Sequence, residues 1–275
     1  MSPEAQKQLS KTVTASQGPS GFFYGRAGQE DLYYTFFGLL LAAVTNAKFR
    51  RRACDVQFRS VDFMSLDLVH GCAWLRVVKM LLWLTLPRFL RNRLSASLLQ
   101  VFHIFFRKEL SLLSKLPSHA YPQQDPDSLY SRFLLGTLYT DFGQAMPEFD
   151  LSDYRLESGL YANLINSTDY GVNATAAALF LLPPDQCGET ADAIMALQET
   201  DGSFKAVASA PEGDLMSTAT AAFALQRCGK TLQSPVKLYL RECFRENGFF
   251  AATPDDPDGD LEYTAYGLLL MGVAT

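Results

Sequence analysis

Turn-forming residues and long apolar runs alternate along this chain in a frame that recurs. Each copy has a Gly followed by aromatic or apolar residues, an Asp ten or twelve residues later, and then a run of small and apolar residues. The Gly and Asp pairs are Gly21 and Asp31, Gly159 and Asp169, Gly202 and Asp214, and Gly248 and Asp260. Two weaker copies carry Asp62 and Asp127, which makes six. Self-similarity at a period of this size is typical of helical repeat arrays.

The spacing of the copies and the pattern inside them predict helical hairpins. From Asp127 onward the acids follow one another after 42, 45 and 46 residues, which leaves room for two helices and their connections. The run after each acid, such as 218–225, is apolar almost all round and predicts a buried helix. The stretch before each Gly, such as 183–200, has apolar residues at helical spacing and predicts an amphipathic helix. We therefore expect an all-α protein with a single domain over residues 1–275, in which six hairpins form an (α/α)6 toroid with the buried helices around a central cavity.

The recurring acids have a simple structural role. An Asp immediately before an apolar helix accepts hydrogen bonds from unpaired backbone N–H groups and contributes about 0.5 to 2 kcal/mol as an N-cap. We expect such caps at Asp31, Asp127, Asp169 and Asp214. For Asp260, which Glu262 follows closely, a cap and an acid catalyst are alternatives.

Composition and charge favour a globular protein and argue against some classes of ligand. With 275 residues, of which 48% are hydrophobic and 19% charged, the chain can bury a substantial core. Its formal net charge of -5 argues against a general nucleic-acid binder. The five cysteines are scattered without CxxC spacing, which indicates reduced thiols. Residues 1–18 form a polar segment without a signal peptide, and the longest uncharged runs fall short of a bilayer span. We expect a soluble, cytoplasmic protein.

The part of the chain that departs most from the repeat frame, residues 48–120, is basic and aromatic. Within it, residues 76–108 combine Trp and Phe side chains with Arg and Lys in helices broken at Pro87. Basic aromatic amphipathic helices suit an anionic membrane surface or an acidic protein partner. The alternative is that the aromatic side chains pack into the ring and the basic ones form its solvated face. The first interpretation would make the protein a peripheral membrane protein.

Two stretches carry a resemblance to a known superfamily. "LQETDGSF" and "SQGPSGFF", which contain Gln198 and Gln17, resemble the Gln-x-x-Asp-Gly-Ser-Phe/Trp repeat of terpenoid cyclases and protein prenyltransferase β-subunits, also called the prenyltransferase and squalene oxidase repeat. Arg155 and Phe244 stand at the Gln position in two other copies. The resemblance implies an α/α toroid fold and an isoprenoid-like ligand, and fold alone does not imply activity.

The resemblance also implies where chemistry would lie. Prenyltransferases of this group hold zinc with an Asp-x-Cys pair and a His, but Met216 and Tyr263 stand at the Cys and His positions here and supply no suitable ligand. We expect no metal and no cofactor. In class II cyclases an Asp-x-Asp-Asp-Thr-Ala motif protonates the substrate, and "DLEYTA" keeps Asp260 and has Glu262 and Tyr263 at the other two acid positions. These three are the candidate catalytic residues.

The apolar residues of the expected inner helices predict the lining of the cavity. The candidate substrate-binding residues are Tyr34, Phe37, Tyr130, Phe133, Phe223 and Tyr266. Aromatic faces suit an isoprenoid or another lipid and can stabilise a carbocation. His70 and Cys72, on an apolar stretch, are expected to be core residues. Two functions stay open: an isoprenoid- or lipid-binding toroid with cyclase-like acid catalysis, and a catalytically inactive scaffold that binds a partner protein through its basic surface.

Overall fold

The computed structural model describes residues 1–86, 112 and 128–273, and it is mostly helical, which confirms the all-α class. Strands in this part of the chain are limited to two short antiparallel ribbons. The chain divides into two compact units. Unit 1 comprises Met1–Pro126 and Leu134–Pro147, and unit 2 comprises Asp127–Phe133 and Glu148–Thr275. The expectation of one domain over the whole chain stays a prediction.

Unit 1 is organised around the apolar helix α2. Its elements are α1 (Pro3–Ala15), β1 (Phe23–Tyr24), β2 (Glu30–Asp31), α2 (Leu32–Thr45), α3 (Arg51–Ser60), the 3-10 turn η1 (Phe63–Ser65), α4 (Leu68–Thr85) and the later part of α9 (Leu129–Asp141). Helix α2 packs against both α1 and α4. Its Leu39 and Leu41 are almost completely buried, as expected for a helix that is apolar on most of its surface.

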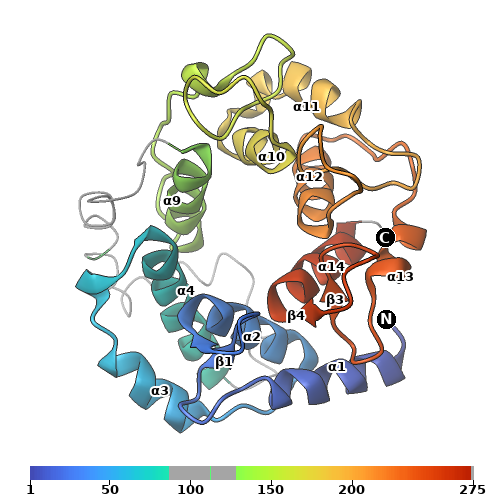
Figure 1. The fold of residues 1–275 in the computed structure, drawn as a ribbon. Helices are drawn as coiled ribbons and strands as arrows, with labels where there is room; N and C mark the ends of the chain where they lie inside the picture. The colour runs from blue at the N-terminus through green and yellow to red at the C-terminus, as the bar shows by residue number, and fades with distance from the viewer. Residues whose placement is uncertain (87–111, 113–127, 274–275) are drawn as a thin grey trace. The chain divides into compact units, whose positions relative to one another are not determined.

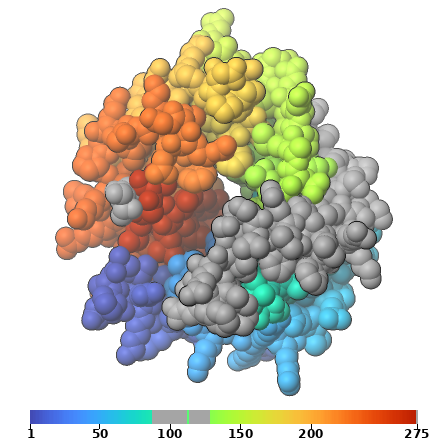
Figure 2. Space-filling model, turned by 180° about the vertical axis from the view of Figure 1, so that it is seen from behind, coloured from blue at the N-terminus to red at the C-terminus, as the bar shows by residue number. Residues whose placement is uncertain are grey.

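Unit 2 contains three neighbouring apolar helices, with α12 between α10 and α14 (Figure 1). Its elements are η3 (Ser152–Tyr154), α10 (Val172–Leu181), η4 (Pro184–Gln186), α11 (Gly188–Met195), α12 (Leu215–Arg227), α13 (Lys237–Cys243), β3 (Phe250–Ala251), β4 (Gly259–Asp260) and α14 (Leu261–Val273). Helix α11 packs on α10 and α12, and α13 packs on α14. In the space-filling view, the red residues of α14 lie directly beside the orange residues that include α12 (Figure 2). The predicted alternation of buried and amphipathic helices is confirmed here, since α13 exposes Leu238 while α12 buries most of its side chains.

The Gly of each well-defined copy adopts a left-handed backbone conformation. The φ angles are +94° at Gly21, +80° at Gly159, +91° at Gly202 and +91° at Gly248. At Gly202 a Cβ atom would also lie 2.7 Å from the carbonyl oxygen of Pro235. Any residue with a Cβ is therefore disfavoured at this position. The recurrence of Gly in the repeat frame thus follows from the positive φ that the turn requires.

A threonine hydroxyl joins each turn to the helix that follows it. The hydroxyl oxygen accepts a hydrogen bond from the backbone N–H two residues after the Gly and donates to the carbonyl one helical turn earlier. The four pairs of threonine and N–H donor are Thr35 with Phe23, Thr175 with Tyr161, Thr218 with Phe204, and Thr264 with Phe250, at 2.9 to 3.0 Å. All four hydroxyls are buried. Because each bond satisfies a buried N–H, these threonines fix the shape of the repeat, and the sequence interpretation did not use them.

The glutamines of the superfamily-like stretches act as clamps. The Gln198 Nε2 donates to the carbonyl oxygens of Gly202 at 3.0 Å and Ser234 at 2.9 Å. Its Oε1 accepts from the backbone N–H groups of Gln233 and Ser234. Gln17 does the same in unit 1, where it bonds the Gly21 carbonyl oxygen and the Arg50 N–H. Each glutamine therefore ties its turn to the segment that leads into the next helix.

Three of the predicted caps are confirmed. The carboxylates of Asp31, Asp214 and Asp260 each accept from the backbone N–H three residues later, at 2.7 to 2.8 Å. Asp127 lies outside the described residues. In its neighbourhood the Ser128 hydroxyl oxygen accepts from the Ser131 N–H at the start of α9.

Two anchor positions were wrong. Helix α10 begins after Gly171, without a side-chain cap, and not after Asp169. Gly171 follows Gly159 by twelve residues, which is the spacing of the two later copies, so the acid at ten residues is a loop residue. Asp62 caps the 3-10 turn η1, while Asp67 caps α4 through the His70 N–H at 2.8 Å. Loop length differs between copies, and the apolar pattern alone does not fix the start of a helix to within a few residues.

Helix α4 is the one described helix with the length and apolar composition to cross a membrane. Of its 18 residues, 44% are buried inside the protein. A core helix passes the same test, because both environments favour apolar side chains on most of the helix surface.

Candidate functional site

One stripe of helix α12 stays partly open to solvent although most of the helix is buried. The stripe consists of Met216, Thr220, Phe223 and Arg227, which follow one another at intervals of four, three and four residues. Such intervals place all four side chains on one face of a helix. The candidate site lies on this face, which is polar at the start of the helix, aromatic further along and basic at its end.

At the polar end, four side chains connect to one partly buried carboxylate, that of Asp214. The Ser217 hydroxyl donates to Oδ1 of Asp214 at 2.7 Å and accepts from Nδ2 of Asn173 at 3.0 Å. The Thr220 hydroxyl donates to Oδ1 of the same asparagine at 2.7 Å, and the Tyr263 side chain hydrogen-bonds Asp214. The network thus joins α10, α12 and α14.

Burial raises the pKa of Asp214, and the hydrogen bonds from Ser217 and Tyr263 only partly oppose that effect. A carboxyl group with a raised pKa holds its proton more readily at neutral pH than an exposed one. This end of the face is therefore polar and carries groups that can hydrogen-bond a ligand.

The predicted catalytic residues lie beside this network at the start of α14. Asp260 is 8% exposed and caps the helix, since its Oδ1 accepts from the Tyr263 N–H. Glu262 lies in the first turn and is also 8% exposed. The Tyr263 side chain bonds the carboxylate of Asp214, which the acid-motif prediction did not include. Sequence spacing could not reveal this pair, because the two residues belong to different hairpins.

Beyond the polar end, three phenylalanines form a row. The Phe133 and Phe180 rings meet edge to face, with centroids 5.5 Å apart, and the Phe180 and Phe223 rings stack at 6.5 Å. The Arg227 guanidinium lies over the Phe180 ring, 3.8 Å from its centroid, a cation–π geometry. The structure therefore brings the predicted Phe133 and Phe223 to a common partner. Phe180 was missed, although it follows Asn173 by seven residues and so shares its face of α10.

The other predicted lining residues lie elsewhere. In unit 1, Phe37 is buried and packs edge to face with Tyr33, at 5.0 Å, and Tyr34 also meets Tyr33 edge to face, at 5.7 Å. In unit 2, Tyr130 is 39% exposed, and Tyr266 packs against the buried cluster of α12, α13 and α14.

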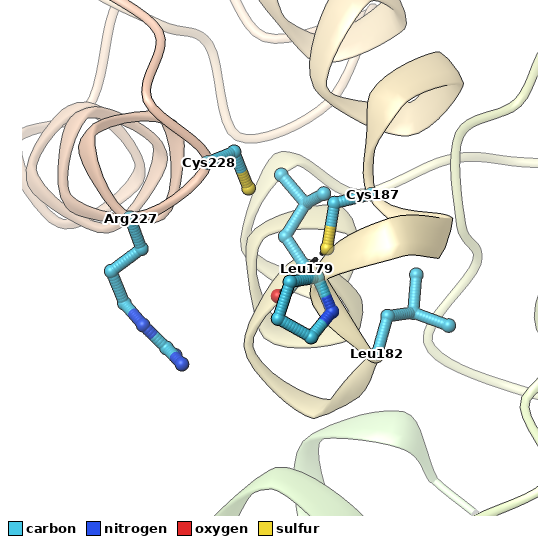
Figure 3. Close-up of a pocket in the computed structure, with 6 residues that line it drawn as sticks. Leu179, Leu182, Cys187, Arg227 and Cys228 are labelled. Atoms are coloured by element: carbon cyan, nitrogen blue, oxygen red, sulfur yellow. Dashed lines mark hydrogen bonds between the residues drawn. The ribbon is translucent and has the colours of Figure 1, made fainter.

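A pocket opens at the C-terminal ends of α10 and α12, next to the aromatic row (Figure 3). Its volume is about 130 Å³, close to that of cavities that hold a benzene-sized molecule. Its lining residues are Leu179, Leu182, Pro184, Cys187, Arg227 and Cys228. The pocket is large enough for a small group of a ligand and too small for a whole isoprenoid chain.

A second polar cluster lies in unit 1. The His70 Nδ1 lies 2.9 Å from Oδ1 of Asp67, and its Nε2 lies 3.4 Å from Oδ2 of Asp31. The hydrogen bond with Asp31, opposed by burial and supported by Asp67, raises the pKa of His70 to about 9. His70 is therefore a charged bridge between the caps of α2 and α4, and the expectation of a core residue was wrong for it. Cys72, at 1% exposure, is a core residue as expected.

Among the described residues, no three His, Cys, Asp or Glu side chains are grouped so that they could hold a metal ion.

The first residues of the basic segment, 76–86, belong to the described part of the chain. The Arg76 Nε lies 2.8 Å from Oδ2 of Asp141, and the Lys79 Nζ donates to the Asp141 carbonyl oxygen. These two cations are engaged within unit 1, and residues 87–108 lie outside the described residues.

Comparison of the chain with protein-family models and with curated proteins finds no match.

Proposed function

We propose that this protein is a single-domain α/α toroid of six hairpins, related to the terpenoid cyclases and protein prenyltransferase β-subunits. The support is the internal regularity of the repeats. Four copies share a left-handed Gly and a buried Thr bond, and two share a Gln clamp at the position of the superfamily's glutamine. Arg155 and Phe244, which replace the Gln, make other contacts: Arg155 pairs with Glu189 at 2.5 Å, and Phe244 packs on Phe250.

We infer that the open face of α12 binds an isoprenoid or a similar lipid-like molecule. The observation that carries this proposal is the partly exposed aromatic row of Phe133, Phe180 and Phe223, which comes from three helices. Exposing aromatic rings to water is unfavourable, so a contiguous aromatic surface favours an apolar ligand. Aromatic faces can also stabilise a developing carbocation.

The same face supports cyclase-like acid catalysis as an extension of the binding function. A proton donor to an alkene must be shielded from water and keep its proton at neutral pH. Asp260 and Glu262 are both buried, and Tyr263 connects their helix to the carboxyl group of Asp214. In this proposal Glu262 donates the proton, and Asp260 and Tyr263 position the start of α14.

The binding proposal is tested with the full-length protein by native mass spectrometry and by titration with farnesyl diphosphate, geranylgeranyl diphosphate and squalene. We expect at least one to bind, and Phe223→Ala to weaken that binding about tenfold, since one ring contact is worth about 1.4 kcal/mol. The matched control is Leu238→Ala, which removes an apolar side chain that is 61% exposed on α13. Absence of binding, or equal affinity in both variants, would contradict the proposal.

The catalytic extension needs a separate readout. Incubation with each bound isoprenoid, followed by product analysis, should show turnover that Glu262→Gln abolishes while affinity stays within about twofold. Binding without turnover would leave a ligand-binding protein and remove the enzyme from the proposal.

A scaffold function is the alternative, and one observation in unit 1 favours it. Arg52, Val56 and Arg59 follow one another at intervals of four and three residues on α3, and all three are exposed, Val56 by 70%. A helix face with basic ends and an apolar centre suits an acidic protein partner. Co-purification of an acidic protein that Arg52→Glu with Arg59→Glu releases, with no isoprenoid bound, would favour this function.

A further inference from the structure

Two cysteines from different elements meet in the pocket at the ends of α10 and α12. Cys187 lies between η4 and α11, and Cys228 is the C-cap of α12. Both line the same pocket, and Figure 3 shows both side chains directed into it. Cys228 contributes to the raised pKa of Cys187, so the two thiols are neighbours in the pocket.

The two thiols differ in access. Cys187 is 5% exposed, and its Sγ donates to the Pro183 carbonyl oxygen at 3.3 Å. Burial, with further contributions from Cys228, raises the pKa of Cys187 to about 11. Cys228 is partly exposed at the pocket. A soluble oxidant therefore reaches Cys228 first, and Cys187 is placed as the second thiol.

The backbone beside Cys228 can accommodate a new bond. A disulfide needs an S–S distance of about 2.05 Å, which is shorter than a non-bonded contact between two sulfur atoms, so the sulfurs must approach each other. Gly229 follows at once, with φ of +69°, and no atom lies within 4 Å of the position its Cβ would occupy. The residue that follows Cys228 is therefore not packed against other atoms on this side.

We propose that Cys187 and Cys228 are a redox-active pair that a peroxide converts into a reversible disulfide. The Cys228 thiol loses its proton and its sulfur attacks one oxygen of hydrogen peroxide; the O–O bond breaks, giving a sulfenic acid and water. The Cys187 thiol then loses its proton and attacks the Cys228 sulfur. The S–S bond forms, the S–O bond breaks, and a second water leaves. Two electrons pass from the sulfurs to the peroxide, and a dithiol such as dithiothreitol reverses the reaction.

The disulfide would link the start of α11 to the end of α12 across the pocket, next to Arg227. Oxidation would therefore close the pocket and hold the basic end of the α12 face in place. The formation of the bond depends only on the two thiols, and not on the ligand proposed above.

The test uses the full-length protein, reduced and then treated with hydrogen peroxide in its folded state. Free thiols are alkylated with iodoacetamide under denaturing conditions, and the protein is digested with trypsin without reduction. Cleavage after Arg155, Lys205, Arg227 and Lys230 places Cys187 in residues 156–205 and Cys228 in residues 228–230, each without another cysteine. We expect these two peptides to be linked, and dithiothreitol to separate them.

Two variants sharpen the result. In Cys187→Ser, the sulfenic acid at Cys228 lacks its partner, so dimedone should label it. Cys243→Ser, which removes a buried cysteine of another cluster, should leave the linked peptides unchanged. The proposal is overturned if both thiols are alkylated after peroxide treatment, or if Cys228 is linked to any other cysteine or to a second copy of the chain.

Discussion

Replacing Thr218 with Val removes one hydroxyl from the repeat turn while keeping the shape of the side chain. In the folded protein that hydroxyl oxygen accepts from the Phe204 N–H at 2.9 Å and donates to the Asp214 carbonyl oxygen at 2.7 Å. Thr218 and Phe204 are both fully buried, so water cannot replace the lost partner of the N–H. The Asp214 carbonyl oxygen keeps its bond from the Thr218 N–H, at 2.9 Å.

The expected loss comes from the orphaned N–H. A buried donor without a partner costs about 1–3 kcal/mol, and we take about 2 kcal/mol for Thr218→Val. For a chain of this size, that corresponds to a fall in Tm of about 4–8 °C. Thr218→Ser keeps the hydroxyl and loses one methyl group, for about 1 kcal/mol. Thr14→Val, on the exposed face of α1, should change stability by less than about 0.5 kcal/mol.

Thermal unfolding measures the three variants, and amide hydrogen exchange locates the cause. The Phe204 amide should lose protection in Thr218→Val and keep it in Thr218→Ser. The reasoning fails if Thr218→Val is as stable as Thr14→Val, or if exchange at Phe204 is the same in all three proteins.

Three further predictions concern single residues. Because the folded pKa of His70 is about 9 against an ordinary value of 6.5, its contribution to stability is complete below pH 6.5 and is lost as the pH rises through 9. The His70 side chain is 36% exposed, so screening limits this contribution to about 1 kcal/mol. Denaturant titrations from pH 6 to 10 should show the loss in the natural protein but not in His70→Asn. Gly202→Ala should destabilise the protein more than Gly229→Ala. Both glycines have positive φ, but only at Gly202 would the new Cβ lie 2.7 Å from the Pro235 carbonyl oxygen. Similar Tm values for the two variants would contradict this reasoning. Gln198→Leu should lower the free energy of unfolding in urea by about 2–3 kcal/mol, because it leaves several backbone groups of the turn without partners. A change below about 1 kcal/mol would show that the clamp is dispensable.

The acid-site prediction shows how far a motif reaches. "DLEYTA" correctly indicated a helix start, which Asp260 caps, and the structure adds that Glu262 is buried two residues later. It could not indicate that the Tyr263 side chain bonds Asp214, because that contact depends on how α12 and α14 pack. A sequence motif contains residues that are close along the chain, whereas a functional site contains residues that are close in space.

The sequence by itself determined the helical class, the buried or amphipathic character of the helices, and the cap role of Asp residues such as Asp31 and Asp214. These are local properties: periodicity, backbone conformation and bonds within one hairpin. Only the tertiary structure decided that Phe180 joins Phe133 and Phe223, that Arg227 covers Phe180, and that His70 bridges two caps. Such pairs depend on the rotation of each helix about its axis and on its angle to its neighbours, and these are set by the packing of side chains from several helices at once.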